Sequence, residues 1–147
     1  MTKTPNTFPD RHDVLTAIGY GVAIWVIATT LITTLGPVLL PDSGSWPGVL
    51  AIIAFTAAAL ALAVIAYVLY RRRRADSITH RLLFGSGIAA TGLLLDAVIY
   101  GAAASRYPSL TEPQQGPVAF FLVSAYAALI IAPHVVRTRQ GEHCPIA

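Results

Sequence analysis

A single acidic residue, Asp96, lies inside a long apolar segment, and it is the residue whose chemistry the sequence marks out first. A carboxyl group inside a lipid bilayer costs about 2.5–3.5 kcal/mol on insertion scales, so it is expected to face other helices or a cavity and to be hydrogen bonded. Tyr100 follows one helical turn later on the same helix face. No lysine or arginine lies at a similar depth in any apolar segment. We therefore expect Asp96 to be neutral or bonded to hydroxyl groups, because burial disfavours the charged form.

Each of the other apolar segments offers a hydroxyl group near the expected depth of Asp96. Asp96 lies eight residues from the outer end of its segment, or about 12 Å deep at 1.5 Å per residue. The same count in the other segments leads to Ala28 with its neighbour Thr29, to Thr56 and to Ser124. These three residues, with Asp96 and Tyr100, form a candidate intramembrane polar site. Two interpretations remain open: Asp96 binds a proton or cation, or it is a structural residue whose hydrogen bonds hold the helices together.

Other residues capable of chemistry give weaker patterns. Cys144 is the only cysteine, which excludes an internal disulfide and the membrane thiol oxidoreductases that need cysteine pairs. His80 and His134 lie near the same ends of neighbouring segments. A haem or metal would need them to face each other within the bilayer, so we favour two interfacial histidines and expect no metal and no cofactor. A single intramembrane acid, without a second carboxylate, predicts a protein that is not an enzyme.

Four apolar segments must position these residues. A membrane-spanning helix needs about 20 mostly apolar residues, and the chain is 55% hydrophobic with only 12% charged residues, against about 25% charged in soluble domains. We therefore predict an all-α fold, a four-helix transmembrane bundle. Asp13 is expected to cap the first span, Gly36-Pro37 to end it, and Trp46 to be an interfacial anchor. The predicted segments are a polar N-terminal arm at 1–13, spans at about 14–36, 48–70, 82–104 and 116–136, and a tail at 137–147.

The basic residues predict how the bundle is oriented. Cytoplasmic loops of membrane proteins are enriched in lysine and arginine, and nine of the ten basic residues fall on one side of the predicted spans, with Arg106 alone on the other. We therefore expect a multi-pass protein of the cell membrane, which in a bacterium is the inner membrane. Both of its termini are expected to lie in the cytoplasm. The net charge is +3, and the basic residues that cause it flank apolar spans. We therefore predict that they contact the bilayer and its anionic lipid head groups, and that the protein does not bind nucleic acid. The residues expected to contact lipid are Arg71, Arg72, Arg73, Arg74 and Arg81.

Small residues predict where the helices approach one another closely. The third span carries Gly85, Gly87 and Gly92. Association of helices in lipid depends on close backbone contact, which small side chains permit. We therefore expect the third span to be the central helix of the bundle.

Two short motifs resemble a known family. Gly21, Trp25 and Thr29 in the first span form the pattern GxxxWxxxT, and Leu93-Leu94-Leu95-Asp96 stands in the third. This chain thereby resembles a bacterial family of uncharacterised four-span membrane proteins, a resemblance that implies the fold and no activity. Trp25 is expected to pack or to face lipid.

Two functions fit these observations. The first is an accessory or scaffold subunit that packs against a larger membrane complex or against further copies of itself. The alternative is a small proton- or cation-coupled transporter or channel that uses Asp96.

Overall fold

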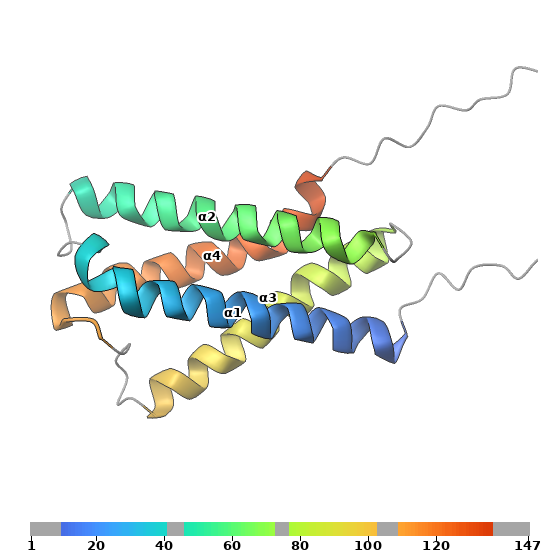
Figure 1. Cartoon of the computed structure of the whole chain (residues 1–147), viewed down its shortest axis with the longest axis horizontal. Helices are drawn as coiled ribbons and strands as arrows, with labels where there is room; N and C mark the ends of the chain where they lie inside the picture. Colours follow the sequence, from blue (N-terminus) through green and yellow to red (C-terminus); the bar gives the residue numbers. More distant parts are fainter. Residues whose placement is uncertain (1–9, 41–45, 73–76, 103–108, 137–147) are drawn as a thin grey trace, which may run out of the picture.

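The computed structural model describes residues 10–40, 46–72, 77–102 and 109–136. These residues form four long helices and one short 3-10 helix, and no strand occurs within the described ranges (Figure 1). All four helices are long and apolar enough to cross a membrane. The predicted all-α, four-helix fold is confirmed. The elements are α1 (Arg11–Leu39), α2 (Trp46–Arg71), α3 (Ile78–Ala102), η1 (Glu112–Gln114) and α4 (Gln115–Val135).

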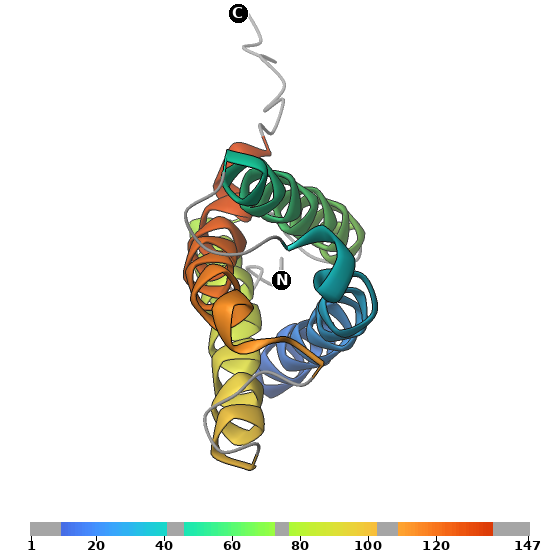
Figure 2. The ribbon, with the colours of Figure 1, turned by 90° about the vertical axis from the view of Figure 1, so that its left-hand side faces the viewer.

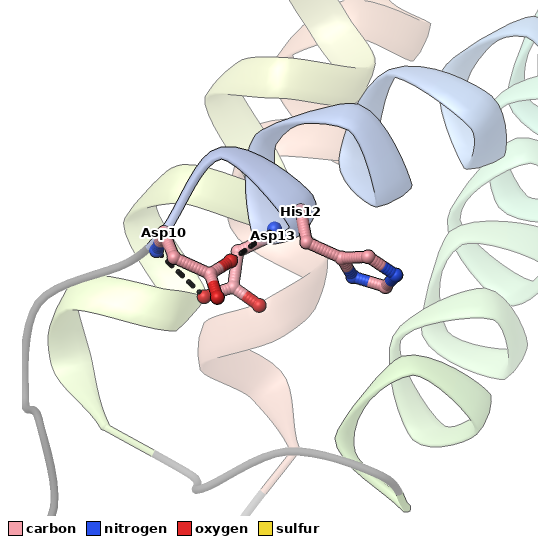
Figure 3. Close-up of side chains that lie close together, drawn as sticks. All are labelled: Asp10, His12 and Asp13. Atoms are coloured by element: carbon pink, nitrogen blue, oxygen red, sulfur yellow. Dashed lines mark hydrogen bonds between the residues drawn. The ribbon is translucent and has the colours of Figure 1, made fainter.

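The first helix begins earlier than the sequence predicts, because two aspartates form a capping box. Asp10 is the N-cap, and its Oδ1 accepts from the backbone N–H of Asp13 at 2.9 Å. The Asp13 carboxylate accepts in return from the Asp10 backbone N–H at 2.9 Å (Figure 3). Each bond satisfies a backbone donor that the helix itself leaves unpaired. Asp13 therefore caps from inside the helix, and residues 11–13 of the predicted polar arm are helical.

The first helix also ends later than predicted. Gly36-Pro37 does not stop α1, which continues to Leu39 with Pro37 inside its last turn. The buried side chain of Gln114 explains this extension, because its Nε2 donates to the carbonyls of Pro37 at 3.3 Å and Leu40 at 2.5 Å. These carbonyls have no partner within the helix, so a contact distant in sequence holds the last turn. Trp46 lies at the first position of α2 and is 78% exposed.

Viewed end-on, the four long helices form a ring in which the contact between α1 and α2 is the least extensive (Figure 2). The α3 helix packs against both α1 and α4, and α2 packs against α4, whereas α1 and α2 touch each other far less. The α3 helix crosses α1 obliquely, so that its yellow end stands away from the other helices in both views (Figures 1 and 2). We call the end that carries Arg71 and Arg81 the arginine end, and the opposite end the η1 end.

Glycines allow the close contacts that α3 makes on its two sides. A Cβ at Gly85 would lie 3.0 Å from the carbonyl oxygen of Ile130 in α4. A Cβ at Gly87 would lie 3.0 Å from the Cβ of Ala17 in α1. Neither glycine could carry a larger side chain without separating the helices.

Two apolar clusters fill the bundle, one near each end. The cluster at the arginine end includes Tyr67, Tyr70 and Phe84, whose rings lie 4.8–6.4 Å apart between centroids. The cluster at the η1 end is smaller and includes Ile32 and Phe121. Asp96 and its hydrogen-bond partners lie between these two clusters.

Candidate polar site at Asp96

Asp96 joins three helices through its carboxyl group. Its side chain is buried, with 5% of the residue exposed. The indole Nε1 of Trp25 in α1 donates to Oδ1 at 2.8 Å, and the hydroxyl group of Tyr126 in α4 donates to Oδ2. Both carboxyl oxygens of this α3 residue are therefore hydrogen bonded to neighbouring helices. We call Asp96, Trp25 and Tyr126 the polar triad.

Two glycines give the triad its geometry. Gly92 precedes Asp96 by one turn, and a Cβ there would lie 2.7 Å from Cε1 of the Tyr126 ring. The absence of that Cβ lets the ring lie against α3 and reach Asp96. Gly21 precedes Trp25 by one turn, and a Cβ there would lie 2.8 Å from the Cβ of Thr91 in α3. This close approach of α1 to α3 brings the indole within hydrogen-bonding distance.

A cavity of about 40 Å³ adjoins the triad. A cavity of this size is large enough to hold water or a small polar group. Its polar lining comes from the triad and Thr29, and no lysine, arginine or histidine of the described ranges lines it. The remaining lining residues are small or apolar: Gly21, Ile24, Ala28, Ile32, Ala59, Ile88, Gly92, Phe121, Leu122, Ala125 and Leu129.

The depth of Asp96 differs from the sequence-based estimate. Trp25 lies at the middle of α1 and Tyr126 near the middle of α4, so the triad is level with the centre of these two helices. Asp96 reaches that level although it lies near one end of α3, because α3 crosses the bundle obliquely (Figure 1). Counting residues from span ends assumes parallel helices, and this assumption misplaced the neighbours of Asp96.

Of the residues with hydroxyl groups that were predicted to surround Asp96, the structure therefore places only some beside it. Thr29 lines the cavity, and Tyr100 packs beside the apolar cluster at the η1 end. Thr56 and Ser124 do not line the cavity. The Ser124 hydroxyl donates to the Phe120 carbonyl of its own helix at 3.0 Å.

The sequence contains a pattern that indicates one hydrogen-bond partner of Asp96, namely Trp25. The motif Gly21, Trp25, Thr29 has a spacing of four, which places all three residues on one helix face, and all three line the cavity. Trp25, expected to pack or to face lipid, donates to Asp96 instead. Tyr126 has no comparable signal, because a tyrosine in an apolar segment is read as an ordinary core aromatic.

A second buried polar contact lies at the arginine end. His80 Nε2 is 3.5 Å from Asp13 Oδ2, and its Nδ1 is 2.8 Å from the Ser77 hydroxyl. Both His80 and Asp13 are buried, so this contact links the starts of α1 and α3. His134, in contrast, is exposed on α4.

Three residues at the start of α1 could by composition hold a metal ion. Ligand atoms of Asp10, His12 and Asp13 lie within 4.8 Å of one another. The two carboxylates are engaged in the capping box, and the exposed imidazole of His12 points away from them (Figure 3). Helix capping accounts for this cluster.

The predicted lipid-contacting arginines lie at helix ends where they are described. Arg71 is in the last turn of α2, Arg72 follows it and is exposed, and Arg81 is in the first turn of α3. Arg73 and Arg74 lie outside the described residues.

The fold and site define a four-helix bundle with long apolar helices and a buried carboxyl group at its centre. The chain belongs to the family described as Domain of unknown function (DUF7937), whose model matches residues 3–145. Searches of the curated proteins and of the solved structures gave no match.

Proposed function

We propose that this chain is an integral, multi-pass protein of the cell membrane. The support is its surface, where large apolar side chains are exposed on all four helices. Large contiguous apolar patches are rare on soluble monomers and mark contact with lipid or a partner. The arginines at one end fit contact with anionic lipid head groups. Examples of exposed apolar residues are Leu15, Val26, Leu50, Ile53, Leu94, Val98, Phe120 and Val123.

Within this membrane protein, we propose that Asp96 is the proton- or cation-binding residue of a small coupled transporter. The observation that carries the proposal is a buried carboxyl group beside a cavity whose lining has no basic side chain in the described ranges. Intramembrane acids in such settings mark proton and ion pathways. The role is binding rather than catalysis, because the lining offers no second acid, histidine or thiol among the described residues.

The triad suits a carboxyl group that changes its protonation state. The Trp25 indole can only donate, whereas the Tyr126 hydroxyl can donate or accept. An ionised Asp96 accepts from both groups. A protonated Asp96 keeps the indole bond at Oδ1 and donates from Oδ2 to the tyrosine oxygen. Proton uptake therefore requires only the rotation of a hydroxyl group and no movement of a helix.

Infrared difference spectroscopy of the purified protein in lipid tests this function. In the difference spectrum between alkaline and acidic pH, we expect a carboxylic C=O component in the wild type that is missing from Asp96→Asn, whereas the exposed carboxyl groups contribute equally to both spectra. Asp13→Asn is the matched control, because it removes the buried carboxyl group at the arginine end and should leave the Asp96 component in place. Identical spectra of wild type and Asp96→Asn would contradict a titrating Asp96.

An accessory or scaffold role is the second candidate, and a different observation favours it. The end of α3 that leaves the bundle exposes Leu94, Val98 and Gly101, and no neighbouring atom lies within 4 Å of a Cβ built at Gly101. A partner helix could pack there. Native-detergent purification should then recover a stoichiometric partner, or a homo-oligomer, that is lost in Gly101→Phe and kept in Asp96→Asn. A monomeric protein without a partner would contradict this role.

A further inference from the structure

An apolar groove lies between α1 and α2, the two neighbouring helices that touch least. Its volume is about 190 Å³, and its rim includes the exposed side chains of Ile27 and Leu31. The groove shares four lining residues with the cavity beside Asp96: Ala28, Ile32, Ala59 and Phe121. The two spaces therefore adjoin each other, with the groove on the apolar surface side and the cavity at the carboxyl group.

We propose that the groove and the cavity open into each other and bind a primary alkylamine in its protonated form, with the apolar tail in the groove and the ammonium group at Asp96. This inference rests on the proposed function, because it names the substrate class of the same site. The groove of about 190 Å³ has room for a single alkyl chain, and the smaller cavity of about 40 Å³ has room for an ammonium group.

The charges and the aromatic rings of the site favour this head group over others. A fatty-acid carboxylate would be repelled by Asp96, and an alcohol would gain no ion pair. Trp25, Tyr126 and Phe121 line the cavity, and aromatic faces attract cations, most strongly where water is excluded.

Binding and proton transfer are linked at Asp96. An uncharged amine can enter through lipid and accept the proton of the Asp96 carboxyl group, which yields an ammonium–carboxylate pair with no net charge. Atoms and charge balance, since the proton moves from Oδ2 to the amine nitrogen. Release as a cation requires Asp96 to take up another proton, so the amine and the proton compete for one carboxylate. This competition is the basis for coupled exchange.

The fluorescence of Trp25 reports directly on the site. Trp46→Phe leaves Trp25 as the only tryptophan. We would titrate this protein, in phosphatidylcholine nanodiscs, with dodecylamine brominated in mid-chain, since bromine quenches nearby indoles. The matched probe is the brominated dodecanol, with both concentrations expressed per lipid. We expect half-maximal quenching by the amine at an about 10-fold lower concentration, equivalent to about 1.4 kcal/mol.

Three variants separate the head-group contact from the groove. Asp96→Asn should abolish the difference between amine and alcohol. Ala58 lines the groove and not the cavity, so Ala58→Phe should weaken quenching by both probes several-fold. Ala57→Phe, one residue away and outside both linings, should leave quenching unchanged. Helical content and elution volume establish that each variant folds.

The outcomes distinguish this inference from the proposed function. Equal quenching by amine and alcohol in the wild type, or an unchanged preference in Asp96→Asn, would overturn the inference even if the infrared band shows that Asp96 titrates. An Asp96-dependent preference for the amine without an infrared band would support amine binding and contradict proton binding. Quenching unaffected by Ala58→Phe would overturn the groove as the site of the tail.

Discussion

The indole of Trp25 gives Asp96 a hydrogen bond that does not depend on pH. An indole N–H has no accepting lone pair and does not titrate, so this donor faces Oδ1 at 2.8 Å whether the acid is charged or neutral. The Tyr126 hydroxyl contacts the other oxygen and can adapt to the protonation state. One fixed donor and one adaptable group therefore hold the carboxyl group in place.

Replacing Trp25 by phenylalanine should destabilise the protein while keeping an aromatic ring at that position. We expect Trp25→Phe to lower the free energy of unfolding by about 1–3 kcal/mol, because a buried acceptor loses its donor. Titration with a denaturing detergent measures this change. Trp46→Phe is the control, since Trp46 is 78% exposed and should change stability by less than about 0.5 kcal/mol. Equal effects would show that the Nε1 bond contributes nothing.

The sequence predicts that Asp96 is important, but it does not predict which side chains donate hydrogen bonds to its carboxyl group. Asp96 stands out because a charged residue in an apolar segment is rare. Trp25 and Tyr126 do not stand out, because each contributes one polar atom to an otherwise apolar side chain. Thr56 and Ser124 carry the hydroxyl groups that residue counting favours, yet the oblique path of α3 brings Asp96 to other neighbours.

The contacts of α3 show how glycine positions control a polar site at the scale of the helix. The Tyr126 ring occupies the space where a Cβ at Gly92 would lie, at 2.7 Å from Cε1. A larger residue there must displace either the ring or the whole of α4. The hydrogen bond to Asp96 depends on that space being free.

Gly92→Ala should therefore disrupt the triad, although only one methyl group is added. We expect a loss of about 1–3 kcal/mol in the free energy of unfolding, typical of an overpacked contact. Gly101→Ala is the matched control in the same helix, because a Cβ there meets nothing within 4 Å and alanine is the better helix former. The denaturing-detergent titration compares the two. A Gly92→Ala protein as stable as Gly101→Ala would mean that the ring shifts without penalty.

The existence of the helices follows from the sequence more directly than their ends do. Long apolar segments predict four helices, and the described part of the chain contains four helices long and apolar enough to cross a membrane. The start of α1 depends on a reciprocal pair of side-chain bonds between Asp10 and Asp13, and its end depends on Gln114 from a distant segment. Local signals such as Gly36-Pro37 lose their effect where a tertiary contact satisfies the backbone.

Across the whole molecule, polar and apolar layers alternate along the bundle. The arginine end carries Arg71, Arg81 and the buried pair of His80 and Asp13. An aromatic cluster follows, then the polar triad with its cavity, and then the second apolar cluster at the η1 end. The triad is therefore separated from both ends by apolar layers, and the groove between α1 and α2 adjoins its cavity on the side of the bundle.

The two ends of this layered bundle differ in charge. Basic residues resist transfer across the membrane, and by sequence position nine of the ten flank the predicted spans on one side, the side to which the described Arg71 and Arg81 belong, so we expect the arginine end to be cytoplasmic. Single cysteines at Ala75 and Glu112, in a Cys144→Ser background, can be labelled in intact cells with a membrane-impermeant thiol reagent. Glu112→Cys should be labelled directly, and Ala75→Cys only after permeabilisation. The reverse pattern would place the arginine end outside and would remove the contact proposed between its arginines and the anionic lipids of the cytoplasmic leaflet.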